Sequence, residues 1–315
     1  MKSLISKAAL FSCLLAVTAI VSCSKDDDNG SNPSSNTISD VVAADADLST
    51  LESALVKANL TATLSSTGPF TLFAPTNEGF TNAGITADVL NSISTTDLSN
   101  ILLYHVIPSA IPAAGVPAGP NAKVIAANGD SVFVTSNANG VFINGIQVIQ
   151  ADISASNGII HKTGNVLIPA VGNIVETAQA DTSFTYLVAA VLRASTGSSD
   201  IAGILSGSDI LTVFAPTNNA FRAAGFPTID AINAADPDAL AGILTYHVIA
   251  GRIFSSDLTN ASMPATLGGA TVTIGVSTSG GTVKGTANAT PSNITKANIV
   301  ATNGVIHVID QVLLP

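Results

Sequence analysis

The chain has 315 residues, of which 47% are hydrophobic and only 10% are charged, and its formal net charge at pH 7 is −10. This length can bury two ordinary hydrophobic cores, and the shortage of charge favours β-rich, loop-rich modules over long solvated helices. The excess of acidic residues excludes the basic surface that nucleic-acid binding requires.

The N-terminus carries an export signal. Lys2 and Lys7 precede an apolar run at residues 8–21, which is too short to span a membrane and has the length of a signal-peptide core. The run ends in Ile-Val-Ser-Cys, which resembles the lipobox of bacterial lipoproteins. The alternative is a secretory peptide with a chance cysteine. We predict a lipoprotein signal peptide at residues 1–22, lipidation of Cys23 and attachment to a membrane through that lipid.

Residues 23–36 are charged at first and then rich in Gly, Ser, Asn and Pro, so they contain nothing that could fill a core. We interpret them as a flexible tether. Their Ser-Lys-Asp-Asp-Asp start resembles the acidic signal that sends Bacteroidetes lipoproteins to the outer face of the outer membrane, with an ordinary acidic linker as the alternative. Cys13 lies in the cleaved part, so Cys23 is the sole mature thiol and no intrachain disulfide can form.

The rest of the chain is a tandem duplication. FTLFAPTNEGF from Phe70 returns as LTVFAPTNNAF from Leu211, 141 residues later. In both halves a Tyr-His-Val-Ile follows, and then a segment that begins Asn-Gly and ends in Pro. One unit of about 140 residues has been duplicated, which indicates a domain pair and not a short-period solenoid. We place the first unit at residues 37–169 and the second at residues 170–315.

Each unit begins with helical patterns. A capping box, Thr37 with Asp40 in the first unit and Asn173 with Glu176 in the second, predicts the first helix. A second helix follows, whose apolar residues recur at i, i+3, i+4 and i+7 and are therefore expected in the core. These residues are Leu48, Leu51 and Leu55 in the first unit and Phe184, Leu187, Val188, Val191 and Leu192 in the second.

Further helix starts are predicted by single capping residues. Ser49 with Glu52 forms another capping box, and Thr76 and Thr217 are placed to cap a turn after each FAP segment. Asp236 followed by proline supplies an N-cap and an N1 residue for a longer helix in the second unit.

The strands are predicted from short apolar or alternating runs. FTLFAP and LTVFAP are strands that end at Pro75 and Pro216, because proline cannot donate to a β-ladder. Strand-like runs also fill the end of each unit, and three Asn-Gly pairs between them predict tight turns. The pairs begin at Asn144, Asn157 and Asn303.

These motifs resemble the fasciclin-like family, known as FAS1, in two tandem copies. The resemblance rests on the FAPTN stretches, the Tyr-His pairs and the closing NGIIH and NGVIHVIDQVLLP segments, and it covers residues 37–315. It implies an α+β fold: two wedge-like β-sandwich domains, each with a cluster of short helices, in a secreted or surface adhesion protein. The first unit departs from the family pattern only in HKTGNVLIP, where the family more often has HVIDxVLLP.

All four histidines lie in the repeated motifs, which raises the hypothesis of a metal or acid–base site. They are His105, His161, His247 and His307. The sequence has no HExxH, no paired cysteines and no HxxxH, and each histidine has apolar neighbours. We interpret them as buried structural histidines and predict no metal, no cofactor and, since no G-x-S-x-G or Walker A motif occurs, no catalytic residue.

Two classes of function stay open. We favour a non-catalytic surface module that attaches the cell to other cells, to matrix protein or to a glycan; the alternative is a glycan-handling accessory lipoprotein or an uncharacterised hydrolase. In the FAS1 family the Tyr-His region has been implicated in adhesion. The resemblance therefore implies Tyr104, His105, Tyr246 and His247 as binding residues for a surface protein or polysaccharide.

Overall fold

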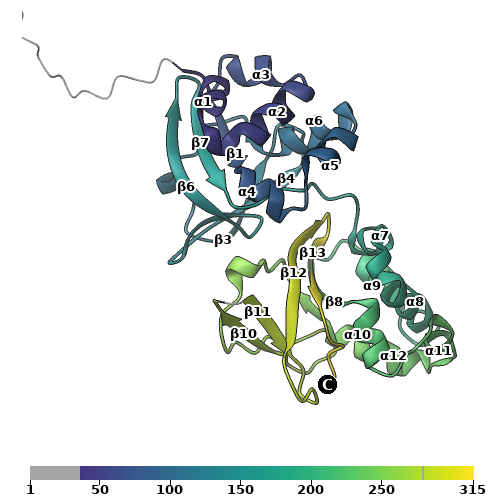
Figure 1. Cartoon of the computed structure of the whole chain (residues 1–315). Coiled ribbons are helices and arrows are strands. Elements are labelled where there is room, and N and C mark those ends of the chain that lie inside the picture. Colours follow the sequence, from purple (N-terminus) through teal and green to yellow (C-terminus); the bar gives the residue numbers. More distant parts are fainter. Residues whose placement is uncertain (1–35, 279) are drawn as a thin grey trace, which may run out of the picture. The chain divides into compact units, whose positions relative to one another are not determined.

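The computed structural model describes residues 36–278 and 280–315 (Figure 1). The predicted signal peptide, Cys23 and nearly all of the tether lie outside the described residues. In the part of the chain that is described, no helix has the length and apolar character needed to cross a membrane.

Each unit combines short helices with a sheet, which confirms the predicted α+β class. The helices of the first unit are α1 (Ile38–Ala44), η1 (Ala46–Leu48), α2 (Ser49–Lys57), α3 (Thr61–Ser65), α4 (Asn77–Asn82), α5 (Ala87–Ser92), α6 (Thr95–Tyr104) and η2 (Ala113–Gly115). Its strands are β1 (Phe70–Pro75), β2 (Val106–Ile107), β3 (Gly119–Ile125), β4 (Ser131–Asn137), β5 (Gly140–Ile143), β6 (Ile146–Ala155) and β7 (Gly158–Thr163).

The second unit repeats this order. Its helices are α7 (Ile174–Gln179), η3 (Thr182–Phe184), α8 (Thr185–Ala194), α9 (Ile201–Ser206), α10 (Asn218–Ala223), α11 (Ile229–Ala234), α12 (Pro237–Tyr246) and η4 (Ser255–Asp257). Its strands are β8 (Leu211–Pro216), β9 (Val248–Ala250), β10 (Thr273–Ser277), β11 (Gly280–Lys284), β12 (Ser292–Ala301) and β13 (Gly304–Ile309).

The two sheets have the same strand order. The described strands of the first unit run β2-β1-β7-β6-β5-β4-β3, and those of the second run β9-β8-β13-β12-β11-β10. In each sheet the FAP strand pairs in parallel with the last strand, β1 with β7 and β8 with β13. An isolated bridge between Ala265 and Thr271 stands where the first unit has β3. The shared order is what a duplicated unit predicts.

The FAP strands separate two hydrophobic clusters in each unit. In β8, Val213 and Ala215 join the cluster formed with the helices, while Phe214 between them joins the cluster on the other face. Leu72 and Phe73 divide in the same way in β1. Successive side chains of a strand point to opposite faces, so one central strand serves both cores.

Most predicted helix starts are confirmed, and one is wrong. The capping boxes at Thr37 and Asn173 form, and Thr76, Thr217 and Asp236 cap the helices that follow them. The predicted box of Ser49 with Glu52 does not form.

Helix α2 instead starts after Leu48, without a cap from its own segment. The side chain of Asn77, from the FAPTN motif, accepts the Thr50 N–H at 2.9 Å and the Ser49 hydroxyl at 3.3 Å. Its amide group donates to the carbonyl of Ala46 at 2.9 Å. A partner 27 residues away in sequence therefore supplies the cap that the local pattern suggested.

The Asn-Gly pairs form two kinds of structure. Asn144 and Gly145 both have positive φ, at 48° and 74°, and make the predicted tight turn between β5 and β6. Asn157 and Asn303 also lie in predicted tight turns, between β6 and β7 and between β12 and β13. Gly158 and Gly304 begin the strands that follow, where a Cβ atom would stand 2.1 Å from the carbonyl oxygen of Phe70 or of Leu211. These two glycines are required by the close approach of the neighbouring strand.

The departure of the first unit from the family pattern has a structural counterpart. Lys162 of β7 occupies the position of Val308 in β13, and the strand continues through it. The buried ammonium group lies 2.7 Å from the carboxylate of Asp45 and 3.2 Å from that of Asp47. The ion pairs replace an apolar contact and fasten the α1–α2 connection to the sheet.

Candidate functional site

The two Tyr-His pairs close the last helix of each helical cluster. Tyr104 ends α6 and Tyr246 ends α12, and His105 and His247 are the C-cap residues. All four side chains are buried, at no more than 2% exposed. The predicted binding residues therefore lie beneath the surface, and a partner would contact the residues that cover them.

His105 and His247 each use both ring nitrogens. Nδ1 lies 2.8 Å from the carbonyl oxygen of the residue four positions earlier, Ile101 or Ile243, and Nε2 accepts the backbone N–H of Leu167 or Leu313. One ring nitrogen thus donates and the other accepts, which is the pattern of neutral imidazole. Burial lowers the pKa of both rings to about 4. The prediction of buried, hydrogen-bonded histidines is confirmed.

The other two histidines hold a bulge in the sheet. Asp152 in β6 and Asn298 in β12 have left-handed backbones, with φ of 59° and 66°, at places where the pairing register shifts. The N–H of each is directed at Nδ1 of His161 or His307, at 3.2 and 3.4 Å.

The second nitrogen of these rings faces a connecting loop. Nε2 of His161 lies 2.8 Å from the carbonyl oxygen of Ile111, and Nε2 of His307 lies 2.8 Å from that of Ile253. Burial lowers the pKa of His307 to about 4. Each ring therefore joins the bulge to the loop that follows β2 or β9.

The tyrosine hydroxyls join the helical cluster to the distal strands. The Tyr104 hydroxyl donates to the Ser131 carbonyl at 2.9 Å and accepts the Asn144 side-chain amide at 2.9 Å. The Tyr246 hydroxyl donates to the Thr271 carbonyl at 2.7 Å and accepts the Thr286 N–H at 3.0 Å. Burial raises the pKa of Tyr104 to about 12, so this hydroxyl keeps its proton at physiological pH.

Sequence reasoning missed the role of two asparagines. Asn303 accepts the Ile174 N–H at 2.9 Å and donates to the carbonyls of Leu205 and Gly207 at 2.9 and 2.8 Å. Asn157 makes the equivalent three bonds in the first unit, to Ile38, Leu64 and Ser66. The repetition of NG in both units was the available signal, but the turn interpretation assigned no role to the asparagine side chain.

The histidines of the repeated motifs have no ring nitrogen available for metal binding or acid–base chemistry. Each of the four histidine rings has a backbone group at both nitrogens, so no ring offers a free ligand atom. Across residues 36–278 and 280–315, no group of three or more His, Cys, Asp or Glu side chains could hold a metal ion.

The loop at residues 266–271, which we call the covering loop, lies against Tyr246. The Leu267 N–H donates to the Val248 carbonyl at 2.8 Å, and the Gly268 N–H donates to the Thr245 carbonyl at 3.1 Å. The Leu267 side chain is 43% exposed. Leu267 thus presents an exposed apolar side chain beside the second Tyr-His pair.

Comparisons with known proteins agree with the repeated architecture. The model of the family described as Fasciclin domain matches residues 46–169 and 182–315. The chain is 29% identical over 252 residues to the transforming growth factor-beta-induced protein ig-h3 of Sus scrofa, covering 79% of this chain and 35% of that protein. It is 39% identical over 138 residues to protein sll1483 of Synechocystis, covering 43% of this chain and 75% of that protein.

Among solved structures, the chain is similar to the FAS1 domain pair from the insect cell adhesion molecule fasciclin I. The sequences are 18% identical, the TM-score is 0.41, and the match covers 85% of this chain and 97% of that one. The chain spans about a third of the length of ig-h3.

Proposed function

Because the chain belongs to the fasciclin-domain family, we propose that it is a non-catalytic adhesion protein, held at the outer membrane by lipid on Cys23, that binds a surface protein or polysaccharide. Fasciclin domains are found in cell adhesion proteins, which supports the adhesive class. The observation that carries the proposal is the duplication of the unit. The polar groups of the repeated motifs make hydrogen bonds inside each unit, so binding falls to the surfaces, and two weakly binding surfaces on one chain gain avidity.

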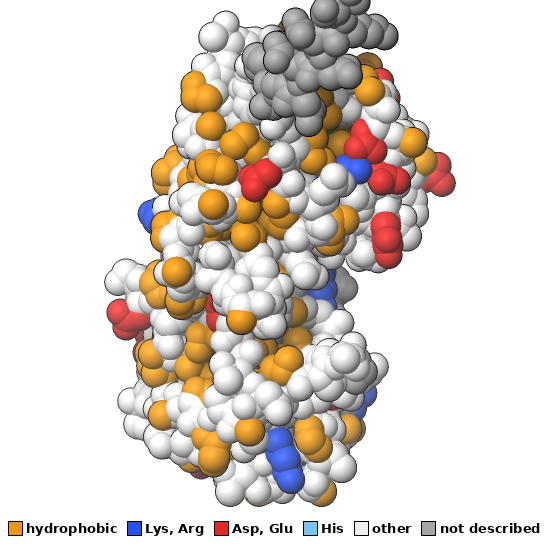
Figure 2. All heavy atoms as spheres, turned by 90° about the vertical axis from the view of Figure 1, so that its left-hand side faces the viewer, with side chains coloured by type: hydrophobic (Ala, Val, Ile, Leu, Met, Phe, Trp, Pro, Cys, Tyr) orange, Lys and Arg blue, Asp and Glu red, His pale blue; other side chains and the backbone are white. Residues whose placement is uncertain are grey.

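The character of the surface agrees with binding by neutral contacts. Figure 2 shows one face on which acidic and basic side chains are sparse and apolar side chains are scattered among uncharged polar ones. Only 10% of all residues are charged. Attachment through such a surface depends on apolar area and hydrogen bonds, and it should change little with salt.

We assign the Tyr-His pairs an indirect part in binding. The buried Tyr246 hydroxyl and the backbone on either side of the pair fix the covering loop, and the exposed side chain of Leu267 makes the contact. Val276 on β10 is a matched control, since its side chain is 41% exposed and also apolar.

The test is attachment of cells that display the protein. We expect Leu267→Ser to weaken attachment severalfold because an apolar contact is lost, and Val276→Ser to leave it near the unchanged level. Both variants should keep the unfolding midpoint of the parent chain. Equal attachment by the two variants would show that the covering loop does not contact the partner. Turnover of a glycan or ester by the purified protein would show that the protein is an enzyme.

Lipid anchoring is tested at Cys23. Radiolabelled fatty acid should be incorporated into the parent chain and not into Cys23→Ala, which should then leave the membrane fraction. Protease treatment of intact cells should remove the two units if they stand outside. Labelling that persists in Cys23→Ala would contradict the anchor, and protection of the units in intact cells would contradict surface exposure.

A further inference from the structure

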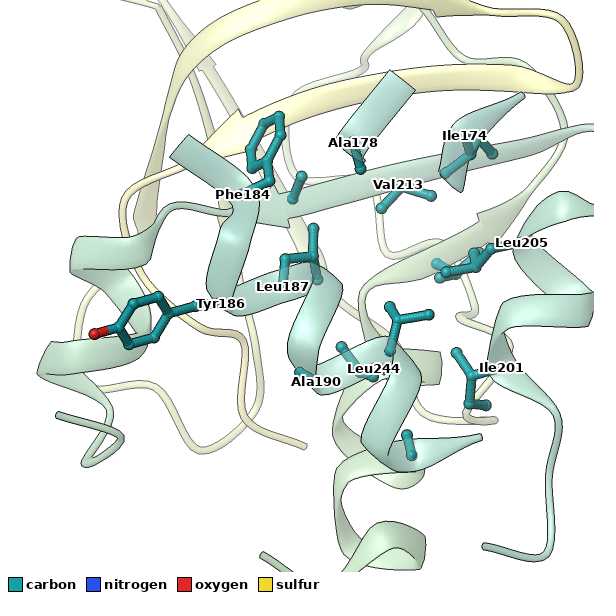
Figure 3. Close-up of a cluster of buried hydrophobic side chains, with 14 of the residues drawn as sticks. Ile174, Ala178, Phe184, Tyr186, Leu187, Ala190, Ile201, Leu205, Val213 and Leu244 are labelled. Atoms are coloured by element: carbon teal, nitrogen blue, oxygen red, sulfur yellow. The ribbon is translucent and has the colours of Figure 1, made fainter. Parts of the chain in front are cut away.

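The second unit contains an apolar pocket between its helices and its sheet. The pocket has an interior volume of about 30 Å³, and it is bounded by α7, α8, α9, α12 and the strands β8, β9 and β13. Figure 3 shows Ala178, Leu187, Leu205 and Val213 directed toward one another from α7, α8, α9 and β8. Buried His247 also borders it, with both ring nitrogens already engaged.

The first unit provides an internal comparison, because the same positions can be read from the duplicated sequence. Ala178, Val191 and Val213 of the second unit stand where the first unit has Val42, Leu55 and Leu72. Each replacement removes carbon atoms from a buried position: two from the first and one from each of the others. Protein interiors are close-packed, so a core that lacks four carbon atoms must be filled from elsewhere or stay open.

One larger residue offsets most of this loss elsewhere in the same core cluster. Phe184 takes the position of Leu48 and adds three carbon atoms to the same core cluster. Phe184 does not border the pocket, however, and the pocket persists beside it.

The burial of the lining confirms that the space opens to solvent. Four pocket residues are 6 or 7% exposed, whereas their four counterparts in the first unit are 0 to 3% exposed. The pocket residues are Ala178, Leu187, Val191 and Leu205, and the counterparts are Val42, Leu51, Leu55 and Leu64. The same backbone positions are therefore buried in both units, but slightly more accessible in the second.

The mouth of the pocket is also more apolar than the same region of the first unit. Val175 and Val188 stand where the first unit has Ser39 and Glu52, so a hydroxyl and a carboxylate have become apolar. Leu192 at the mouth is 55% exposed, although its spacing predicted a core position. Water makes no hydrogen bonds to an apolar mouth, whereas an apolar ligand that covers it removes apolar surface from water, which is favourable.

We propose that this pocket of the second unit binds the end of the unbranched alkyl chain of a small amphiphile, with the polar end of the ligand outside, beside Gln179. The missing carbon atoms come from three of the side chains that line the pocket, and a slot of this small volume admits the narrow end of an alkyl chain more readily than a ring. Gln179 is exposed at the mouth and can hydrogen-bond a hydroxyl or a carboxylate. This site is independent of the covering loop and of the proposed adhesion.

The test uses the chain from Asn36 onward, which contains every residue of the hydrophobic clusters. The probes are straight-chain alcohols from butanol to decanol, with octanoate to separate a free fatty acid from an uncharged amphiphile and benzyl alcohol as the ring. The readout is the ¹³C-methyl resonance of Ala178. We expect each added methylene to strengthen binding about threefold to fourfold until the slot is full. Binding of octanol, octanoate or both supports the site, whereas benzyl alcohol binding as tightly as octanol overturns the alkyl assignment.

Refilling the pocket provides the decisive variant. Ala178→Val, Val191→Leu and Val213→Leu together install residues that the first unit already accommodates, and should weaken octanol binding at least tenfold with an unchanged or higher Tm. Because Ala178 is replaced, binding to this variant is read from the Leu205 methyl resonances.

A second variant tests the mouth of the pocket, and a control variant tests whether any apolar substitution affects binding. Val175→Ser with Val188→Glu, the residues of the first unit, should also weaken binding by making the mouth polar. Val56→Leu, on the exposed face of α2, should leave it unchanged. Unaltered octanol binding in the refilled variant, or a large fall in its Tm, would show that the slot is not the site.

Discussion

Both units are expected to lose stability as the pH falls from 6.5 to 4, because buried histidines must stay neutral in the folded chain. Burial lowers the pKa of His105, His247 and His307 from 6.5 to about 4. Between these values the unfolded chain binds protons that the folded chain does not, so the stabilisation is complete above pH 6.5 and is lost on acidification. At pH 4.5 each ring should cost the folded state about 2 to 3 kcal/mol.

The measurement is urea unfolding at pH 7, 5.5 and 4.5. The acidic groups whose pKa is lowered, such as Asp45 and Asp310, lose their stabilisation only below their ordinary value near 3.8, outside this range. Hydrogen exchange can separate the units, because the amides of Leu167 and Leu313 each donate to one of the rings. A stability that stays flat between pH 7 and 4.5 would contradict neutral burial.

Replacing Asn303 should be among the most damaging single changes. Asn303→Ala removes three hydrogen bonds and leaves the Ile174 N–H and the carbonyls of Leu205 and Gly207 without their partner. At about 1 kcal/mol for each bond, the free energy of unfolding should fall by about 3 kcal/mol. Asn157→Ala should have a similar effect in the first unit.

A suitable control is Asn82→Ala. The Asn82 side chain is exposed and makes a single bond, to the Gly164 carbonyl at 3.1 Å. We expect it to cost about 1 kcal/mol or less in the same denaturant series. If Asn303→Ala and Asn82→Ala cost the same, the three-bond junction does not stabilise the fold as described.

The fold could be predicted wherever the signal was local or repeated. Thr76 and Thr217 cap the helices that follow them directly, and the duplicated FAP segments became the central parallel strands. The cap of α2 could not be predicted, because its acceptor is Asn77, which only tertiary structure brings to that helix end. The short strands β2 and β9 were missed as well, since two or three residues carry no periodicity.

The sequence predicted the chemical state of the histidines at the candidate site, but not which segments cover the Tyr-His pairs. Apolar neighbours correctly indicated buried, hydrogen-bonded histidines, but nothing in the Tyr-His motif showed that the covering loop would close over Tyr246. The pocket beside α8 depends on three small differences between aligned residues. Those differences acquire meaning only when the structure shows that all three side chains line the same pocket.

The central claim is that the paired fasciclin domains bind a partner at the cell surface without catalysis. The most direct measurement compares attachment of cells that display the full chain, the chain without either unit, and the tether alone. We expect attachment to be strongest with both units, weaker with one and absent with the tether, as two weak sites acting together require. Attachment that is unchanged when residues 37–315 are deleted would contradict the account.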